Sequence, residues 1–449
     1  MKILGIETSC DETAAAVVED GVSILSNVVV SQIDIFAEYG GVIPEVAARS
    51  HLEAVLPVID KALADASCTW DDIDAIAVTH APGLLGSLLI GTLTARTLAI
   101  LHDKPLYAVH HLKSHVYANW LGDLVEMPSF GSRRSRPSPR GERANSRAAA
   151  LRNPLKKAFS TNSTFLVAPA FPLLALVVSG GHTQILYMKA HNQFEIIGTT
   201  HDDAVGECFD KVAKILGLPY PGGPSIAKAA LGETGVFATC PSGTFRATRA
   251  KSSCPAGHTA KTPLSPGDAN RYHLPHPKVE GLDFSFSGLK TAVLRAVQKE
   301  AGVPISYPSH KLKELLTPQQ VADFAASFQK TAVEILCEKV ELALSQYPEV
   351  KSIVVAGGVS ASEELRRIFM LRLGSRRSRP SPRGERANSR AAALRNPPSR
   401  SINILFPTPG LSGVNGAMVA AACYFEIQSG VKPTDPYALN IYPRISIEQ

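Results

Sequence analysis

The spacing of apolar residues changes several times along the chain, and each spacing predicts a different element. Short apolar runs bounded by turn-forming residues are typical of strands, and longer stretches with apolar residues three or four positions apart are typical of helices. The N-terminal part of the chain predicts strands at 2–7, 14–18, 22–30 and 73–78 and helices at 44–64 and 84–101. Asp20-Gly21 predicts a hairpin turn between the second and third strands.

The second part of the chain repeats this alternation. Its pattern predicts strands at 173–178, 183–187, 353–356 and 402–406 and helices at 204–216, 287–300, 317–345 and 413–427. Strands that alternate with helices indicate an α/β fold. Because a unit of strand, turn and further strands occurs in each half, we expect two related lobes with a cleft between them. Ligands of such folds bind where the loops at the strand ends converge.

One segment occurs twice without any change. Residues 131–154 and 374–397 both read GSRRSRPSPRGERANSRAAALRNP. With a single leucine, this segment cannot bury enough apolar surface to offset the entropy lost on ordering it. An arginine-rich arm for nucleic acid is one interpretation. The identity of two copies in unrelated contexts favours the other, a mobile coding insertion tolerated in two surface loops.

The repeated segment also sets the predicted domain boundaries. We expect an N-terminal lobe at 1–130 that includes the HLKSH segment, an insertion rich in Arg and Ser at 131–170, and a C-terminal lobe at 171–449. Two further insertions are expected inside the C-terminal lobe. One is a stretch rich in Ser, Thr, Pro and Gly at about 238–270, and the other is the second repeat copy at about 374–399.

The net charge of +6 comes from the repeated segment. The 449 residues include 46 Lys and Arg against 40 Asp and Glu, and each copy of the repeat contributes seven Arg and one Glu. Without the two copies, 32 basic residues stand against 38 acidic ones, a net charge of −6. The overall charge therefore gives no indication of an anionic partner.

Cysteine spacing and hydropathy indicate a reduced, cytoplasmic protein without membrane contact. The seven cysteines form no C-x-x-C pair, which argues against a disulfide framework and a four-cysteine zinc site. The acidic residues Glu7, Asp11 and Glu12 come early in the chain, so its start has no apolar signal-peptide core. The longest apolar stretch, 84–101, falls short of the ~20 apolar residues that a membrane-spanning helix needs.

Four turns next to predicted elements predict a nucleotide or phosphate site; they lie at residues 7–13, 179–183, 222–224 and 357–360. Glycines let a backbone approach a ligand closely, and hydroxyls with free N–H groups bind phosphate. Three acidic residues, Asp11, Glu12 and Asp210, lie near these turns. Their pattern leaves open whether they handle ribose, metal or protons, or only supply negative charge at a helix N-terminus.

His111 and His115 lie four positions apart in HLKSH. If 112–120 is helical, both imidazoles project from one face, which suits a single metal ion. A zinc peptidase of the H-E-x-x-H kind would need Glu directly after the first histidine, and this position is Leu112. The chain also has neither a G-x-S-x-G nucleophile elbow nor a P-loop.

These motifs, taken in order, resemble the TsaD/Kae family of tRNA threonylcarbamoyladenosine synthases. The resemblance covers nearly all of the chain outside the insertions. It is carried by GIETSCDET (5–13), GGVIPEVAARSHLE (40–53), APGLLGSLLIG (81–91), VHHLKSH (109–115), LVVSGGHTQ (176–184), GECFDKVAKILGLPYPGGPSI (206–226), FSFSGLKTAV (284–293), AGGVSAS (356–362) and NGAM (415–418).

The resemblance implies a fold, a reaction and partners. The fold is of the actin/Hsp70/acetate-kinase (ASKHA) type, with two ribonuclease-H-like lobes around a central cleft. The reaction transfers a threonylcarbamoyl group from threonylcarbamoyl-AMP to N6 of adenosine 37 in tRNAs that read codons beginning with A. Bacterial members work with a TsaB-like pseudo-paralogue and a TsaE-like ATPase.

The resemblance also implies roles for particular residues. His111 and His115 would bind one divalent metal per subunit, with iron (Fe2+) as the family's usual metal. Asp11 and Glu12 would lie near the reaction centre as catalytic residues. The residues expected to hold the adenylate and the threonylcarbamoyl group are Val177, Val178, Ser179, Gly180, Gly181, Asp210 and Gly223.

Two positions depart from the family pattern. Val414 stands where the family has an Asp that is the third metal ligand, and Ser362 stands where an Asn usually contacts the nucleotide. Valine cannot ligate a metal, so two imidazoles alone would bind it more weakly. Two alternatives to an active transferase stay open. One is a small-molecule kinase or ATPase of the same fold, which leaves HLKSH unexplained, and the other is a catalytically weakened scaffold of the tRNA-modifying complex.

Overall fold

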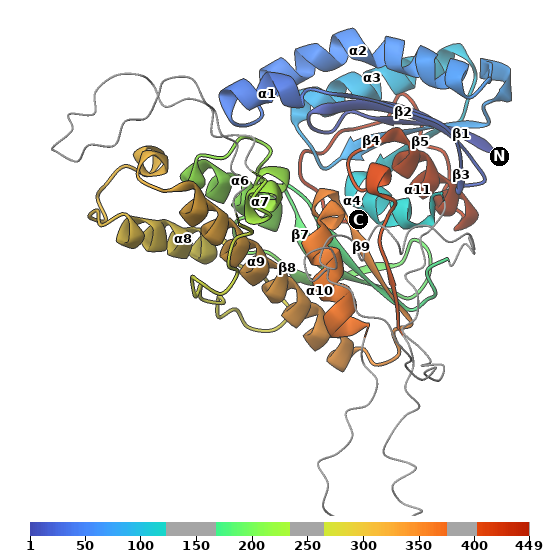
Figure 1. The fold of residues 1–449 in the computed structure, drawn as a ribbon. Coiled ribbons are helices and arrows are strands. Elements are labelled where there is room, and N and C mark those ends of the chain that lie inside the picture. Colours follow the sequence, from blue (N-terminus) through green and yellow to red (C-terminus); the bar gives the residue numbers. More distant parts are fainter. Residues whose placement is uncertain (123–167, 234–264, 375–401, 449) are drawn as a thin grey trace, which may run out of the picture.

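The computed structural model describes residues 1–122, 168–233, 265–374 and 402–448 (Figure 1). Nearly all of both repeat copies therefore lies outside the described residues. The elements before residue 123 are β1 (Lys2–Glu7), β2 (Glu12–Glu19), β3 (Ser23–Ser31), α1 (Ile33–Tyr39), α2 (Pro44–Asp65), β4 (Ala75–Ala81), α3 (Leu85–Leu101), β5 (Leu106–His110) and α4 (His111–Tyr117). Those after residue 167 are β6 (Leu173–Val178), β7 (Thr183–Met188), β8 (Phe194–Thr199), α6 (Val205–Leu216), α7 (Gly222–Ala230), α8 (Ser287–Glu300), α9 (Pro318–Gln346), β9 (Ser352–Ala356), α10 (Glu363–Leu373), β10 (Asn403–Leu405) and α11 (Gly416–Gln428).

The two halves build the same sheet. The first has the strand order β3-β2-β1-β4-β5 and the second has β8-β7-β6-β9-β10. In each sheet three consecutive strands form an antiparallel meander, and two later strands are added parallel to the first strand of the meander. This repeated topology confirms the predicted α/β fold of two ribonuclease-H-like lobes.

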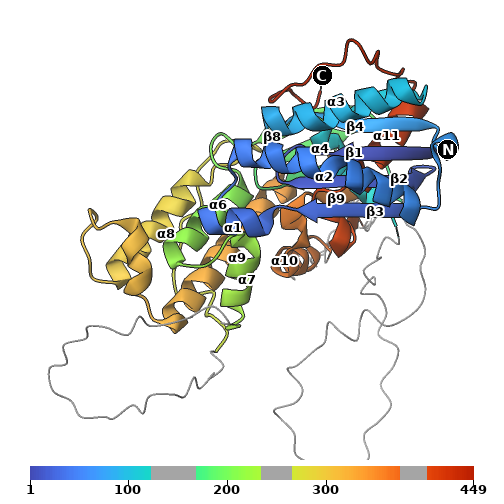
Figure 2. The same cartoon turned by 90° about the horizontal axis from the view of Figure 1, so that it is seen from above.

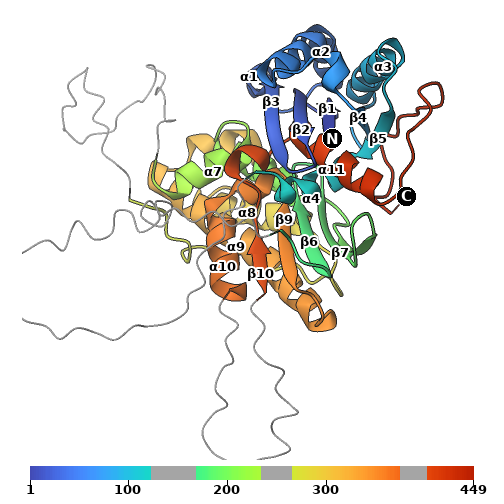
Figure 3. The ribbon, with the colours of Figure 1, turned by 90° about the vertical axis from the view of Figure 1, so that its right-hand side faces the viewer.

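The two sheets lie between three layers of helices, as Figures 2 and 3 show from two further directions. Side chains alternate between the faces of each strand. In β1, Leu4 and Ile6 pack against α2 and α3, whereas Ile3 faces the inner layer of α4 and α11. Leu173 and Ala175 of β6 also pack against this inner layer, so one apolar core joins the two lobes. A third core lies between the second sheet and helices α6 to α10.

Helix α11 returns the chain to the first sheet, although it comes from the C-terminal end. It packs on β1 and β2, and the fit is close: a Cβ on Gly5 would collide with the Gly416 carbonyl and the Ala420 backbone nitrogen. The predicted boundaries at 1–130 and 171–449 stay a prediction. Among the described residues, no helix is long and apolar enough to cross a membrane.

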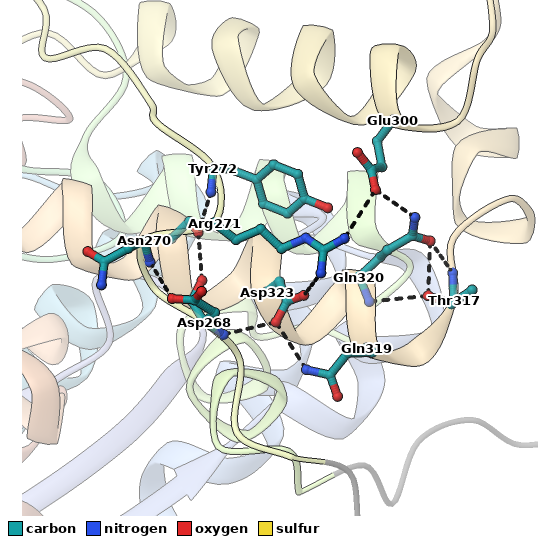
Figure 4. Close-up of polar contacts among 10 residues, drawn as sticks. Asp268, Asn270, Arg271, Tyr272, Glu300, Thr317, Gln319, Gln320 and Asp323 are labelled. Carbon is teal, nitrogen blue, oxygen red and sulfur yellow. Dashed lines mark hydrogen bonds and ion pairs between the residues drawn. The ribbon is translucent and has the colours of Figure 1, made fainter.

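The segment that follows residue 264 is tied to the start of α9 (Figure 4). The buried carboxylate of Asp323 accepts hydrogen bonds from the Asp268 backbone N–H at 2.9 Å and from the Gln319 amide at 3.0 Å, and it pairs with Arg271 at 3.2 Å. Tyr272 stacks on Phe324 with ring centroids 3.6 Å apart. Residues 265–270, which the sequence places in an insertion, thus contact the C-terminal lobe directly.

Candidate functional site

The histidine pair lies in the inner layer between the lobes. His111 is the first residue of α4, directly after β5, and His115 lies one helical turn later. Both side chains are buried, and their rings meet nearly at right angles with centroids 4.6 Å apart. The helix expected at 112–120 is confirmed as α4 followed by a short 3-10 turn at Ala118–Trp120. The spacing therefore brings the two imidazoles together as predicted.

A carboxylate from the first strand orients His111. Glu7 is fully buried, and its Oε2 lies 3.0 Å from His111 Nδ1 and accepts a hydrogen bond from Thr79 Oγ1 at 2.6 Å. Burial raises the pKa of Glu7, but attraction to His111 and the hydrogen bonds outweigh it and lower the pKa to about 2. An ionised carboxylate only accepts hydrogen bonds, so His111 Nδ1 donates to Glu7.

Two further imidazoles are held uncharged. Burial, followed by the proximity of His111, lowers the pKa of His115 well below its ordinary value. The same two causes lower the pKa of His182 to about 4. His115 Nδ1 is buried without a hydrogen-bond partner in the described structure, so its lone pair or proton is unsatisfied. Neutral imidazoles with available nitrogens are suitable metal ligands.

The donor set is nevertheless too small for a complete metal site. Among the described residues, no group of three His, Cys, Asp or Glu side chains is placed to hold one ion. Val414 precedes Asn415, the N-cap of α11, and packs against the inner apolar core. At the position where the family resemblance implies a third metal ligand, this chain therefore has an apolar side chain. The two histidines supply only part of the coordination that a metal ion needs.

Acidic residues of the two halves of the chain lie near one another. Asp11 directly precedes β2, whose first residue is Glu12. Burial, and then the charge and hydrogen bonding of Asp11, raise the pKa of Glu12. Burial raises the pKa of Asp210, with a contribution from Asp11, and Asp210 Oδ1 accepts the Gly222 N–H at 2.6 Å.

Three of the predicted glycines border open space. A Cβ on Gly180, Gly181 or Gly223 would meet no atom within 4 Å, so packing does not require glycine there. A ligand that lies close to the backbone would require glycine at these positions. Gly206 differs, because a Cβ there would collide with the Ser179 carbonyl at 2.5 Å. It lets the start of α6 approach this turn.

The remaining predicted substrate residues shape the same turn. Val177 and Val178 end β6, and both residues are fully buried within the sheet. Ser179 closes the turn, since its N–H donates to the His182 carbonyl at 2.9 Å and its Oγ accepts the His182 N–H at 3.1 Å.

Sequence reasoning missed Glu7 and His182 as site residues. Both lie inside motifs that were singled out, GIETSCDET and LVVSGGHTQ. A carboxylate at the end of an otherwise apolar strand was the available signal for Glu7, because such a charge is buried only with partners. His182 carries no comparable signal, since its closeness to His111 depends on how the lobes pack.

The chain also resembles proteins of known function. It matches the model of the family "TsaD: tRNA N6-adenosine threonylcarbamoyltransferase" over residues 23–132 and 156–421, and the break between the two ranges falls on the first repeat copy. It is 39% identical over 431 residues to the tRNA N6-adenosine threonylcarbamoyltransferase of Symbiobacterium thermophilum, which covers 96% of this chain and 93% of that protein. The corresponding protein of Bacillus thuringiensis strain Al Hakam is 37% identical over 448 residues, covering 99% and 96%.

Among solved structures, the chain is similar to component A of the (R)-2-hydroxyglutaryl-CoA dehydratase of Acidaminococcus fermentans. It is 12% identical and covers 96% of this chain and 99% of that chain, with a TM-score of 0.40.

Proposed function

We propose, since the chain belongs to the TsaD family of tRNA N6-adenosine threonylcarbamoyltransferases, that threonylcarbamoyl-AMP is the acyl donor with which its cleft modifies tRNA. The observation that supports this donor is the open glycine turn at Gly180 and Gly181, which adjoins the start of α6, the helix that carries Asp210. Backbone N–H groups of such a turn suit the phosphate of an adenylate. A kinase reading is not favoured, because the relatives are named as transferases of this one kind.

The reaction needs few groups from the protein. The adenosine N6 attacks the carbamoyl carbonyl carbon, the new C–N bond forms, and the bond between this carbon and the phosphate oxygen of AMP breaks. AMP leaves with the electron pair, and the N6 proton must pass to a base. Turn N–H groups stabilise the negative charge that grows on the leaving phosphate.

We assign the base to Asp11 rather than Glu12. Burial of Glu12 favours its protonated form, whereas Asp11 lies close enough to Asp210 of the other half to contribute to the raised pKa of that carboxyl. Asp11→Asn is expected to lower tRNA modification by about 100-fold, within the range typical of a lost general base. Glu12→Gln mimics the protonated side chain and is the matched control, expected to keep activity within about threefold at pH 7. Equal losses in both variants would contradict this assignment.

The assay uses the purified chain with threonylcarbamoyl-AMP, unmodified tRNA and the partner proteins. Appearance of threonylcarbamoyladenosine in the tRNA, with release of AMP, supports the proposed donor. AMP release without the modified nucleoside, or modification that requires a different acyl source, would contradict it.

We further propose that His111 and His115 hold a divalent metal, iron by family resemblance, with reduced affinity. When bound, such an ion polarises carbonyl or phosphate oxygens. The incomplete donor set means that no step of the reaction is assigned to it.

Helices α2 and α3 carry an exposed apolar surface that suits the TsaB-like partner. The two helices lie side by side on the outer face of the first sheet (Figure 2). They expose large apolar side chains at helical spacing. These are Leu52 and Leu56 on α2 and Leu85, Leu89 and Leu93 on α3. An exposed apolar patch of this kind marks a protein interface. We propose that the TsaB-like protein covers it, and that the TsaE-like ATPase joins this complex in the cytoplasm, where the tRNA substrate occurs.

Leu89→Glu is expected to weaken binding of the TsaB-like protein by at least about 10-fold, because a charge would be buried at the interface. Leu342→Glu on α9 is the matched control, since Leu342 is 39% exposed and Leu89 is 43% exposed. The two affinities are compared by isothermal titration calorimetry. Unchanged affinity for Leu89→Glu would place the partner elsewhere.

A further inference from the structure

The C-terminal segment, residues 434–448, runs across the first lobe and ends on the second (Figure 3). Near its start, the Thr434 N–H donates to the Leu106 carbonyl at 2.7 Å. Near its end, Glu448 accepts the Ile196 N–H of β8 at 2.7 Å, and Ile447 is buried in the core between the lobes. This segment therefore bridges the lobes on the side of the cleft that holds the histidines.

The C-terminal segment forms one wall of a cavity of about 280 Å³. The opposite wall comes from the ends of strands in both lobes: Gly83 after β4, Leu112 at the start of α4, and His182 after β6. Strand ends of this kind are where α/β folds bind ligands. The cavity touches none of the residues predicted to hold the acyl adenylate, but its lining includes His182, which directly follows their turn.

Arg444 is the one side chain with a full charge in the lining of this cavity. It is exposed, and in the described structure it makes neither an ion pair nor a hydrogen bond. Its two neighbours are fixed, because the Pro443 carbonyl accepts the Gly83 N–H at 3.3 Å and the Ile445 carbonyl lies 3.4 Å from His110 Nε2. The backbone thus holds an unpaired guanidinium at the rim of the cavity.

We propose that this cavity is the entry for the acceptor tRNA and that Arg444 binds a phosphate beside the adenosine to be modified. The inference rests on the proposed function and names the substrate side of the same cleft. A guanidinium matches the geometry of a phosphate group and makes charge-assisted hydrogen bonds to it. The exposed rim suits a macromolecule, whereas none of the residues expected to hold the small acyl adenylate lines this cavity.

The test measures binding of unmodified tRNA by fluorescence anisotropy over a range of salt concentrations. Arg444→Ala is expected to raise Kd about 3- to 10-fold and to reduce the slope of log Kd against log salt by about 0.7 to 0.9, the value for one lost phosphate contact. Arg444→Lys should keep the slope, since it keeps the charge. Lys432→Ala, which removes an exposed cation two residues before this segment, is the matched control with an unchanged slope.

Steady-state kinetics separate the two anionic substrates. The proposal expects Arg444→Ala to raise KM for tRNA and to leave kcat and the KM for threonylcarbamoyl-AMP unchanged. An unchanged tRNA slope, or a KM effect confined to threonylcarbamoyl-AMP, would overturn it in favour of a small-molecule carboxylate or phosphate. Because the anisotropy readout needs no turnover, failure of the acyl donor proposal would not affect this result.

Discussion

Replacing His111 with alanine is expected to lower tRNA modification by about 100-fold or more and to destabilise the fold by about 3 kcal/mol. The first effect follows because His111 is one of the two histidines proposed to hold the metal, and His115 alone would not retain it. The second follows because Glu7 is fully buried and would lose its imidazole partner at 3.0 Å. Activity is measured as threonylcarbamoyladenosine formed in tRNA, and stability by urea unfolding.

A second substitution separates the two effects. His111→Gln keeps an N–H donor for Glu7 and removes the imidazole, so it is expected to recover most of the stability and none of the activity. The interpretation would be contradicted if His111→Gln were as active as the unchanged protein, or if His111→Ala lost no stability.

Replacing Val414 with aspartate is expected to raise metal affinity about 10- to 100-fold and to increase transferase activity. The unchanged protein is expected to bind less than one metal ion per chain, because two neutral imidazoles neither complete the coordination nor offset the ion's charge. Val414 is only partly buried and lies directly before the N-cap of α11. A carboxylate there keeps contact with water and adds favourable charge near a helix N-terminus.

Metal content is measured by elemental analysis of protein purified under anaerobic conditions, and affinity by competition with a chelator. Val414→Asn is the control, since it has a similar shape and a neutral oxygen, and it is expected to recover only part of the affinity. One metal ion bound per chain of the unchanged protein would show that valine at this position does not lower metal affinity.

Local signals explain why much of the fold could be predicted. Strands such as 2–7 and 173–178 and the long helices carry their pattern in consecutive residues, and the structure confirms them closely. Strands β5 and β8 were missed, although β10, which was predicted, is shorter than either. Helices α1 and α10 were also missed, since α1 is a seven-residue helix and α10 has charged residues at five of its positions.

The site was predictable only where its residues are neighbours in sequence. His111 and His115 share one helix, and Gly180 and Gly181 share one turn, so spacing alone brings them together. Glu7 meets His111 only because β1 and β5 flank β4 in one sheet. The placing of α11 on the first sheet and of Arg444 beside His182 depends on contacts between residues far apart in the chain, which no local pattern encodes.

The central claim, that this chain is a tRNA-modifying transferase with an incomplete metal site, is tested most directly in cells. A strain depleted of its own enzyme is complemented with the unchanged protein and with Val414→Asp, and threonylcarbamoyladenosine in its tRNA is measured by mass spectrometry. We expect the modified nucleoside in both strains, at a higher level with Val414→Asp. Absence of the nucleoside from both, while both proteins still bind the TsaB-like partner, would contradict the claim and identify the chain as a scaffold.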